Sequence, residues 1–87
     1  MNSHNRSATI YIQNLNEKVP ISELKNSLFQ LFANLGLDVR EVHAKANIKM
    51  RGQAFVVCGD EDQAEQGIAS LQGHSFYNKA LRLSLSK

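Results

Sequence analysis

Hydrophobic residues recur at two different spacings along the chain, and the first spacing is every second position. Such alternation is typical of a β-strand with one buried face, because successive side chains of a strand point to opposite sides. The alternation and the β-branched and aromatic content predict four strands, at Thr9–Leu15, Val39–Ala44, Gln53–Cys58 and Leu81–Ser86. The polar and basic residues 45–50 are predicted to form the loop of a hairpin.

The second spacing is three or four residues, which places apolar side chains on one stripe of a helix with 3.6 residues per turn. This spacing runs from Ile21 to Leu35, between the first two predicted strands. Pro20 suits the entrance of this helix, because the first amides of a helix lack intrahelical acceptors. Gly36 suits the left-handed residue that commonly ends one.

A second helix is predicted after the third strand, from Asp60 to about Gly73. Asp60 and Gln63 resemble a capping box, in which Asp60 accepts an orphan amide and the Gln63 side chain reaches back. The resulting order is βαββαβ. It predicts an α+β fold, a ferredoxin-like sandwich with a four-stranded antiparallel sheet and both helices on one face. We expect residues 9–87 to form this single domain and residues 1–8 to form a flexible tail.

This architecture leaves one face of the sheet uncovered, and the alternation assigns to it Tyr11, Gln13, Gln53, Phe55, Val57, Arg82 and Ser84. Exposed rings need a partner that covers them, and rings beside cations form a surface on which unpaired bases stack. The alternative places Tyr11 and Phe55 in the core, but it would bury the polar members of this set and expose isoleucines and leucines. The pattern therefore favours a surface for single-stranded RNA.

The positions of the charged residues bear on this interpretation more than the net charge does, because a net charge of +2 does not by itself indicate a nucleic-acid partner. No acidic residue lies between Glu41 and Asp60, where Lys45, Lys49 and Arg51 occur. A simple solvated surface is the alternative interpretation of such a run.

Several functional classes lack support in the sequence. The 87 residues suffice for one domain, contain no apolar run long enough to cross a bilayer and begin without the apolar stretch of a secretory signal. The lone Cys58 excludes an internal disulfide and a multi-cysteine metal site. His4, His43 and His74 have no ligand spacing and are interpreted as surface or loop residues. No catalytic residue, metal site or cofactor is predicted, and residues 16–18 offer no glycine-rich cradle for an acylphosphatase-like hydrolase.

Two segments carry a family resemblance. Residues 51–56, Arg-Gly-Gln-Ala-Phe-Val, and residues 10–15, Ile-Tyr-Ile-Gln-Asn-Leu, resemble the two submotifs of an RNA recognition motif domain. More narrowly, residues 9–12, 14–18, 23–25, 49–56 and 76–79 resemble the spliceosomal pair formed by the A protein of the U1 particle and the B-double-prime protein of the U2 particle. Gln53, where most of these domains have an aromatic residue, is the most specific mark.

The resemblance implies binding of a hairpin loop of spliceosomal small nuclear RNA, in the nucleus and without catalysis. Tyr11, Gln53 and Phe55 would stack on bases, and Gln13 and Asn14 would read base edges. Met50 would belong to a loop that protrudes through the RNA, unless it is a filler residue. The implied RNA contacts are Tyr11, Gln13, Asn14, Glu17, Lys18, Lys49, Met50, Arg51, Gln53, Phe55, Lys79, Arg82 and Lys87.

Departures from the family pattern favour the U2 branch. Pro20 and Ile21 stand where relatives often carry lysines, and the U2-type protein relies on a leucine-rich-repeat partner of the U2 A-prime type. Phe29 falls about 60° beyond the apolar stripe of its helix. It either covers the edge of the core or marks a protein-binding surface, here predicted as Glu23, Asn26, Phe29, Gln30 and Ala33. Other spliceosomal proteins are further expected partners, a U1-type protein and a purely protein-binding module remain alternatives, and no membrane partner is expected.

Overall fold

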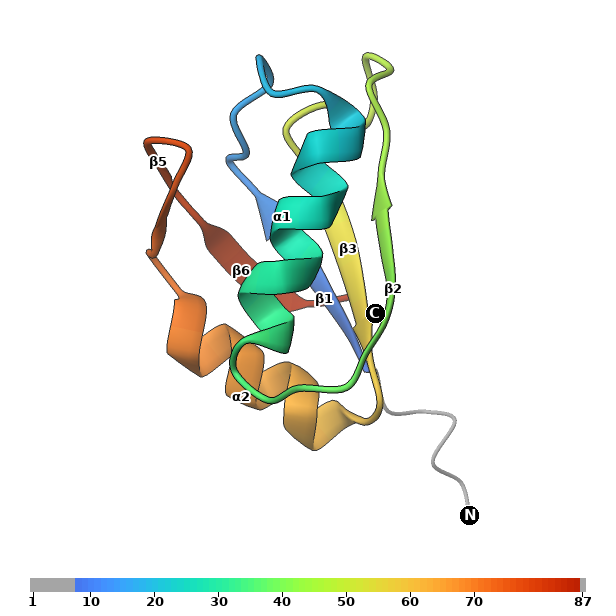
Figure 1. Ribbon diagram of the computed structural model, residues 1–87, viewed down its shortest axis with the longest axis vertical. Helices are drawn as coiled ribbons and strands as arrows, with labels where there is room; N and C mark the ends of the chain where they lie inside the picture. Colours follow the sequence, from blue (N-terminus) through green and yellow to red (C-terminus); the bar gives the residue numbers. More distant parts are fainter. Residues whose placement is uncertain (1–7, 87) are drawn as a thin grey trace.

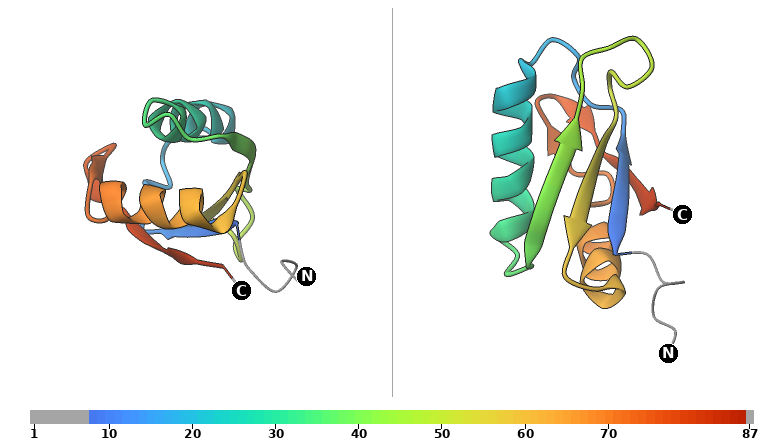
Figure 2. Two further views of the ribbon diagram at one scale, coloured as in Figure 1. Left: turned by 90° about the horizontal axis from the view of Figure 1, so that it is seen from below. Right: turned by 90° about the vertical axis from the view of Figure 1, so that its right-hand side faces the viewer.

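The chain folds into two layers, a sheet and a pair of helices packed on one of its faces (Figures 1 and 2). The computed structural model describes residues 8–86. The elements in chain order are β1 (Thr9–Gln13), α1 (Ile21–Ala33), β2 (Val39–Ala44), β3 (Ala54–Cys58), α2 (Glu61–Leu71), β4 (Ser75–Phe76), β5 (Lys79–Ala80) and β6 (Arg82–Leu85). The main sheet is antiparallel with strand order β2-β3-β1-β6, which confirms the predicted α+β sandwich.

The two central strands divide their residues between a buried and an open face. Ile10, Ile12 and Val56 are fully buried beneath the helices. Tyr11 and Phe55, which alternate with them, are half-buried and belong to the other face. The alternative with both rings in the core is therefore wrong, because the apolar side chains of β1 and β3 already occupy that position.

Helix α1 buries the stripe that its spacing predicts. Leu24, Leu28 and Phe32 are between 0% and 3% exposed. The helix ends at Ala33, two residues before the predicted boundary, because the chain tightens into a turn there: the amide of Gly36 donates to the carbonyl of Ala33, and Gly36 has a φ of +83°. A left-handed conformation at this point is what makes glycine suitable.

Helix α2 begins as predicted, but its capping residues form only half of a capping box. The amide of Gln63 donates to Asp60 Oδ1 at 2.9 Å. The Gln63 side chain does not reach back; its Oε1 accepts the amide of Asp38 at 2.7 Å, because that amide lies just ahead of β2 and has no ladder partner within the strand. Gln63 therefore links the start of α2 to the entrance of β2.

A short hairpin follows α2 and was not predicted. Strands β4 and β5 pair through Ser75 with Ala80 and Phe76 with Lys79, and Tyr77 and Asn78 make the turn with φ of 50° and 70°. Two central residues with positive φ are typical of a two-residue hairpin. The last strand of the main sheet, β6, then begins one residue later than predicted, although Leu81 is buried at 1% exposure.

The residue before β1 extends the pairing of this strand with β3. The amide of Cys58 donates to the carbonyl of Ala8 at 2.8 Å, so Ala8, which the sequence assigned to the tail, continues the pairing of β1 with β3. The remainder of the predicted tail, residues 1–7, and the predicted RNA contact Lys87 lie outside the described residues. Within residues 8–86, no helix combines the length and apolar character needed to span a membrane.

Candidate RNA-binding surface

The open face of the sheet presents two aromatic rings side by side. Tyr11 and Phe55 are directly opposite each other on β1 and β3. Their ring centroids are 5.2 Å apart and their planes differ by 27°. Both residues are half-buried, and both helices lie on the opposite side of the sheet (Figure 2). The juxtaposition predicted from alternation is thus present, on the uncovered face.

Gln53 is fixed beside these rings by two hydrogen bonds. The Tyr11 hydroxyl donates to Gln53 Oε1 at 2.8 Å. Gln53 Nε2 donates to the carbonyl of Lys49 at 3.4 Å. Because an amide group has two donor hydrogens and two acceptor lone pairs, a hydrogen and a lone pair remain for another molecule. The contacts hold the amide in one orientation next to the ring pair.

The neighbouring position along β1 adds a second polar row. Gln13 is half-buried and lies directly opposite Arg82 on β6, which is exposed. Both belong to the open face, since Ile12 and Leu83 alternate with them and are buried. The structure therefore places an amide and a guanidinium on either side of the β1–β6 seam, as the sequence predicted.

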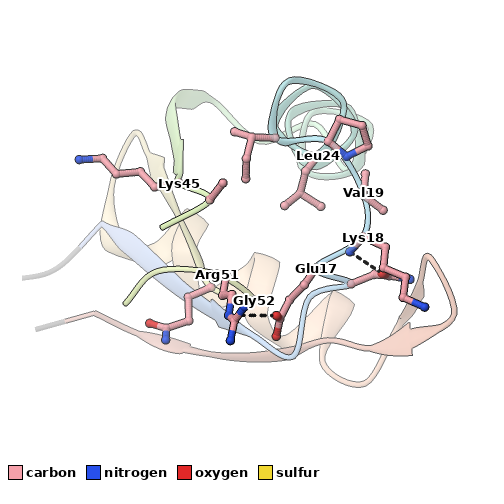
Figure 3. Close-up of a pocket in the computed structure, with 12 residues that line it drawn as sticks. Glu17, Lys18, Val19, Leu24, Lys45, Arg51 and Gly52 are labelled. Carbon is pink, nitrogen blue, oxygen red and sulfur yellow. Dashed lines mark hydrogen bonds and ion pairs between the residues drawn. The ribbon is translucent and has the colours of Figure 1, made fainter. Parts of the chain in front are cut away.

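Cationic side chains surround the end of the face where β1 stops and β3 starts. Lys18, Lys49 and Lys79 are all exposed there. Arg51 forms an ion pair with Glu17, with Arg51 Nε 3.3 Å from Glu17 Oε1 and both side chains more than half exposed. The pair closes one side of a cavity of about 330 Å³ between the β1–α1 and β2–β3 loops, and Lys45 points away from it (Figure 3).

Two asparagines tie the β4–β5 hairpin to the end of β1. Asn14 Nδ2 donates to the carbonyl of Ala80 at 2.8 Å, and Asn16 Nδ2 donates to the carbonyl of Tyr77 at 2.9 Å. Lys79 lies between these two anchor points in the sequence. One donor of Asn14, predicted to read base edges, is thus engaged within the protein, and Asn14 fixes the strand that carries Lys79.

The β2–β3 loop carries the exposed apolar residues of this region. Ile48 is 82% exposed and Met50 is half-buried. The amide of Met50 donates to Asn47 Oδ1 at 2.9 Å, so a local turn shapes the loop. The loop extends past the ends of the strands, in the yellow-green segment of Figure 2. That this loop protrudes through an RNA hairpin stays a prediction.

A histidine also lies on the open face, and the sequence interpretation gave it no role. His43 on β2 is directly opposite Phe55 on β3. Its Nε2 lies 2.6 Å from Glu41 Oε1, and its side chain is 57% exposed. The alternation within the predicted strand 39–44 already held the signal, because the neighbouring Val42 and Ala44 are apolar.

The predicted protein-binding residues occupy the outer side of α1. Phe29 is 42% exposed at one edge of this arc. At the other edge, the Tyr77 hydroxyl donates to Glu23 Oε2 at 2.9 Å, while Asn26 and Gln30 line a groove of about 350 Å³ beside Phe76. Glu23, Asn26, Phe29, Gln30 and Ala33 span about 120° of the helix circumference. That a protein binds there stays a prediction.

The single cysteine is part of the hydrophobic core. Cys58 is 2% exposed, at the end of β3 on the core side. Burial raises the pKa of its thiol, and the negative charges of Asp38 and Asp60 raise it further. Such a thiol is a poor nucleophile and metal ligand, since the thiolate is the reactive form. Among residues 8–86, no three His, Cys, Asp or Glu side chains are grouped to hold a metal ion.

Comparison with curated proteins identifies relatives from two spliceosomal particles. The chain is 42% identical over 79 residues to the U1 small nuclear ribonucleoprotein A of Drosophila melanogaster, covering 91% of this chain and 36% of that protein. It is 40% identical over 79 residues to the U2 small nuclear ribonucleoprotein B'' of Arabidopsis thaliana, covering 91% and 34%. The chain thus spans about a third of the length of these relatives.

Solved structures show the same fold. A complete computational redesign of human U1A protein matches with a TM-score of 0.83 at 23% identity, covering 93% of this chain and 83% of that one. The second RNA recognition motif domain of yeast poly(U)-binding protein matches with a TM-score of 0.72 at 21% identity, covering 91% and 93%. The family model of the RNA recognition motif matches residues 10–82, which include both predicted submotifs. The chain therefore belongs to the RNA recognition motif family.

Proposed function

We propose that this chain binds a hairpin loop of a spliceosomal small nuclear RNA on the open face of its sheet. It would act in the nucleus, as part of a small nuclear ribonucleoprotein in pre-mRNA splicing, and without catalysis. The observation that carries this proposal is the pair of half-buried rings, Tyr11 and Phe55, with centroids 5.2 Å apart on a face that no helix covers. The curated relatives named for U1 and U2 particles support the choice of RNA.

The stacking chemistry follows from the ring geometry. Nucleobases in single strands are free to stack on aromatic side chains, and each stacked base is worth about 1–3 kcal/mol by alanine substitution. The planes of the two rings differ by only 27° and the rings stack on each other, so they form one apolar pair on the open face. Gln53, fixed by the Tyr11 hydroxyl, retains hydrogen-bonding capacity for a base edge next to this surface.

The rim supplies attraction for phosphates. Lys18, Lys49, Lys79 and Arg82 are exposed around the face, and each neutralised phosphate releases a counterion. Arg51 would contact the region that closes the loop. Glu17 is a carboxylate and repels phosphates, so we assign to it the orientation of Arg51 through their 3.3 Å ion pair. Met50 would lean on bases from the protruding loop.

We favour a protein of the U2 type over one of the U1 type. The net charge of only +2 and the uncharged Pro20 and Ile21 at the entrance of α1 support weak RNA attraction by the domain alone. A leucine-rich-repeat protein of the U2 A-prime type would then assist, and the outer side of α1, where Phe29 is 42% exposed, is its proposed docking surface. The identities to relatives of the two kinds, 42% and 40%, do not separate the branches.

The test is a titration of the purified chain with labelled U1 and U2 small nuclear RNA transcripts. We expect saturable binding to at least one transcript, with U2 RNA bound better once a leucine-rich-repeat protein of the U2 A-prime type is added. Preference for U1 RNA under all conditions would identify the U1-type alternative. Absence of binding to either transcript, with the fold intact by circular dichroism, would favour a protein-binding module.

A further inference from the structure

The row of side chains that contains the ring pair continues onto the edge strand. His43 is the Cα partner of Phe55 on one side, just as Tyr11 is on the other, and Ser84 is the partner of Tyr11. Side chains directly opposite each other in an antiparallel pair share a face, with Cβ atoms about 4.5–5.5 Å apart. One row therefore crosses all four strands of the sheet, and its members are His43, Phe55, Tyr11 and Ser84.

The His43 ring is accessible and held in place. Its side chain is 57% exposed, and Glu41, two residues earlier on the same face of β2, has Oε1 2.6 Å from His43 Nε2. Strand β2 is at the edge of the sheet, so His43 ends the row. An imidazole is planar, and histidine is among the side chains on which single-stranded bases stack.

We propose that His43 is a third RNA-contacting ring, which receives the nucleotide next to the one on Phe55, and that Glu41 is its positioning residue. The inference rests on the proposed function and adds to it a residue outside both submotifs. A base that leaves the face of Phe55 toward β2 meets His43 directly, because no residue intervenes between the two in the strand register. Glu41 fixes the imidazole through one nitrogen and leaves its ring face free.

The test compares variants in titrations with labelled U1 and U2 small nuclear RNA transcripts. His43→Ala should weaken binding by about five- to tenfold, the lower end of the range for one stacked base. His43→Phe, which keeps a ring at this position, should restore affinity. Glu41→Ala should weaken binding less than His43→Ala does, and Glu41→Gln, which keeps an acceptor for His43, should restore affinity. His74→Ala, which removes another exposed histidine just after α2, is the matched control and should behave as the unmodified chain.

The outcomes separate this inference from the proposed function. If Phe55→Ala loses RNA while His43→Ala binds like the unmodified chain, the inference about His43 is wrong and the proposed function stands. If the unmodified chain binds neither transcript, the proposed function fails and the inference fails with it. Thermal melting of each variant verifies the fold, and His43→Phe keeps the test decisive if the alanine variant melts early.

Discussion

The two faces of strands β1 and β3 are made from neighbouring residues but differ in what they contact. On the helix-covered face, Ile10, Ile12 and Val56 are 0% exposed and pack against α1 and α2. On the open face, Tyr11 and Phe55 stack on each other and remain accessible. Because side chains alternate along a strand, alternate residues of the same strand contribute to stability and to the proposed binding face. Substitutions on the two faces should therefore have separable effects.

The largest effect on stability is expected from Phe32→Ala. Phe32 is 0% exposed on the buried face of α1, near the end of the helix, and truncating such a ring removes about 3–5 kcal/mol of unfolding free energy. Denaturant unfolding measures the loss. Phe29→Ala on the same helix, 42% exposed, is the matched control and should cost far less. Equal losses for the two variants would contradict the assignment of the buried face.

A smaller loss is expected from Gly67→Ala in α2. A Cβ at this position would lie 3.1–3.2 Å from methyl and ring carbons of Ile10, Leu37 and Phe32. Overpacking of this kind costs about 1–3 kcal/mol and outweighs the gain of about 1 kcal/mol in helix propensity. Ser70→Ala, exposed on the same helix, supplies the control for propensity alone. If the same unfolding measurements show that Gly67→Ala is more stable, the neighbouring side chains can move to admit the added methyl group, which would contradict this prediction.

On the open face, Arg51→Ala should weaken RNA binding and reduce its salt dependence. Each lost phosphate neutralisation lowers the slope of log K against log salt by about 0.7 for single strands. An unchanged slope in titrations at several salt concentrations would remove Arg51 from phosphate contact. Glu17→Gln removes the ion-pair partner of Arg51 without changing the fold, and it should shift affinity by less than about 1 kcal/mol.

The smallest effect concerns Cys58, whose buried thiol is expected to have low reactivity. Because burial raises the pKa of its thiol, native protein at neutral pH should react slowly with iodoacetamide. Protein unfolded in denaturant supplies the control and should react at the rate of a free thiol. Fast modification of the native protein, measured by mass spectrometry, would contradict the buried position.

The sequence was sufficient for the parts of the molecule that depend on periodicity. Alternation in residues 9–13 and 54–58 placed Tyr11 and Phe55 on one face, and the helical spacing found Leu24, Leu28 and Phe32. Both kinds of pattern depend on local geometry and on burial, which a single sequence displays directly.

The features that were missed depend on pairing between distant segments. The β4–β5 hairpin has strands of two residues and a Tyr77–Asn78 turn without glycine, so neither alternation nor turn composition marks it. The contact between Gln63 and Asp38 replaces the half of the predicted capping box in which the Gln63 side chain reaches back, and it joins residues that are 25 positions apart. The position of His43 opposite Phe55 needs the strand register, which the pattern of one strand does not fix.

The most direct test combines RNA titration with thermal melting for Phe55→Ala and Phe32→Ala. If the open face binds RNA and the covered face supports the fold, Phe55→Ala should lose at least about fivefold in affinity, the minimum for one stacked base, while its melting temperature stays close to that of the unmodified chain. Phe32→Ala should instead melt at a clearly lower temperature than the unmodified chain. Retained RNA affinity together with early melting of Phe55→Ala would contradict the division of the sheet into a binding face and a structural face.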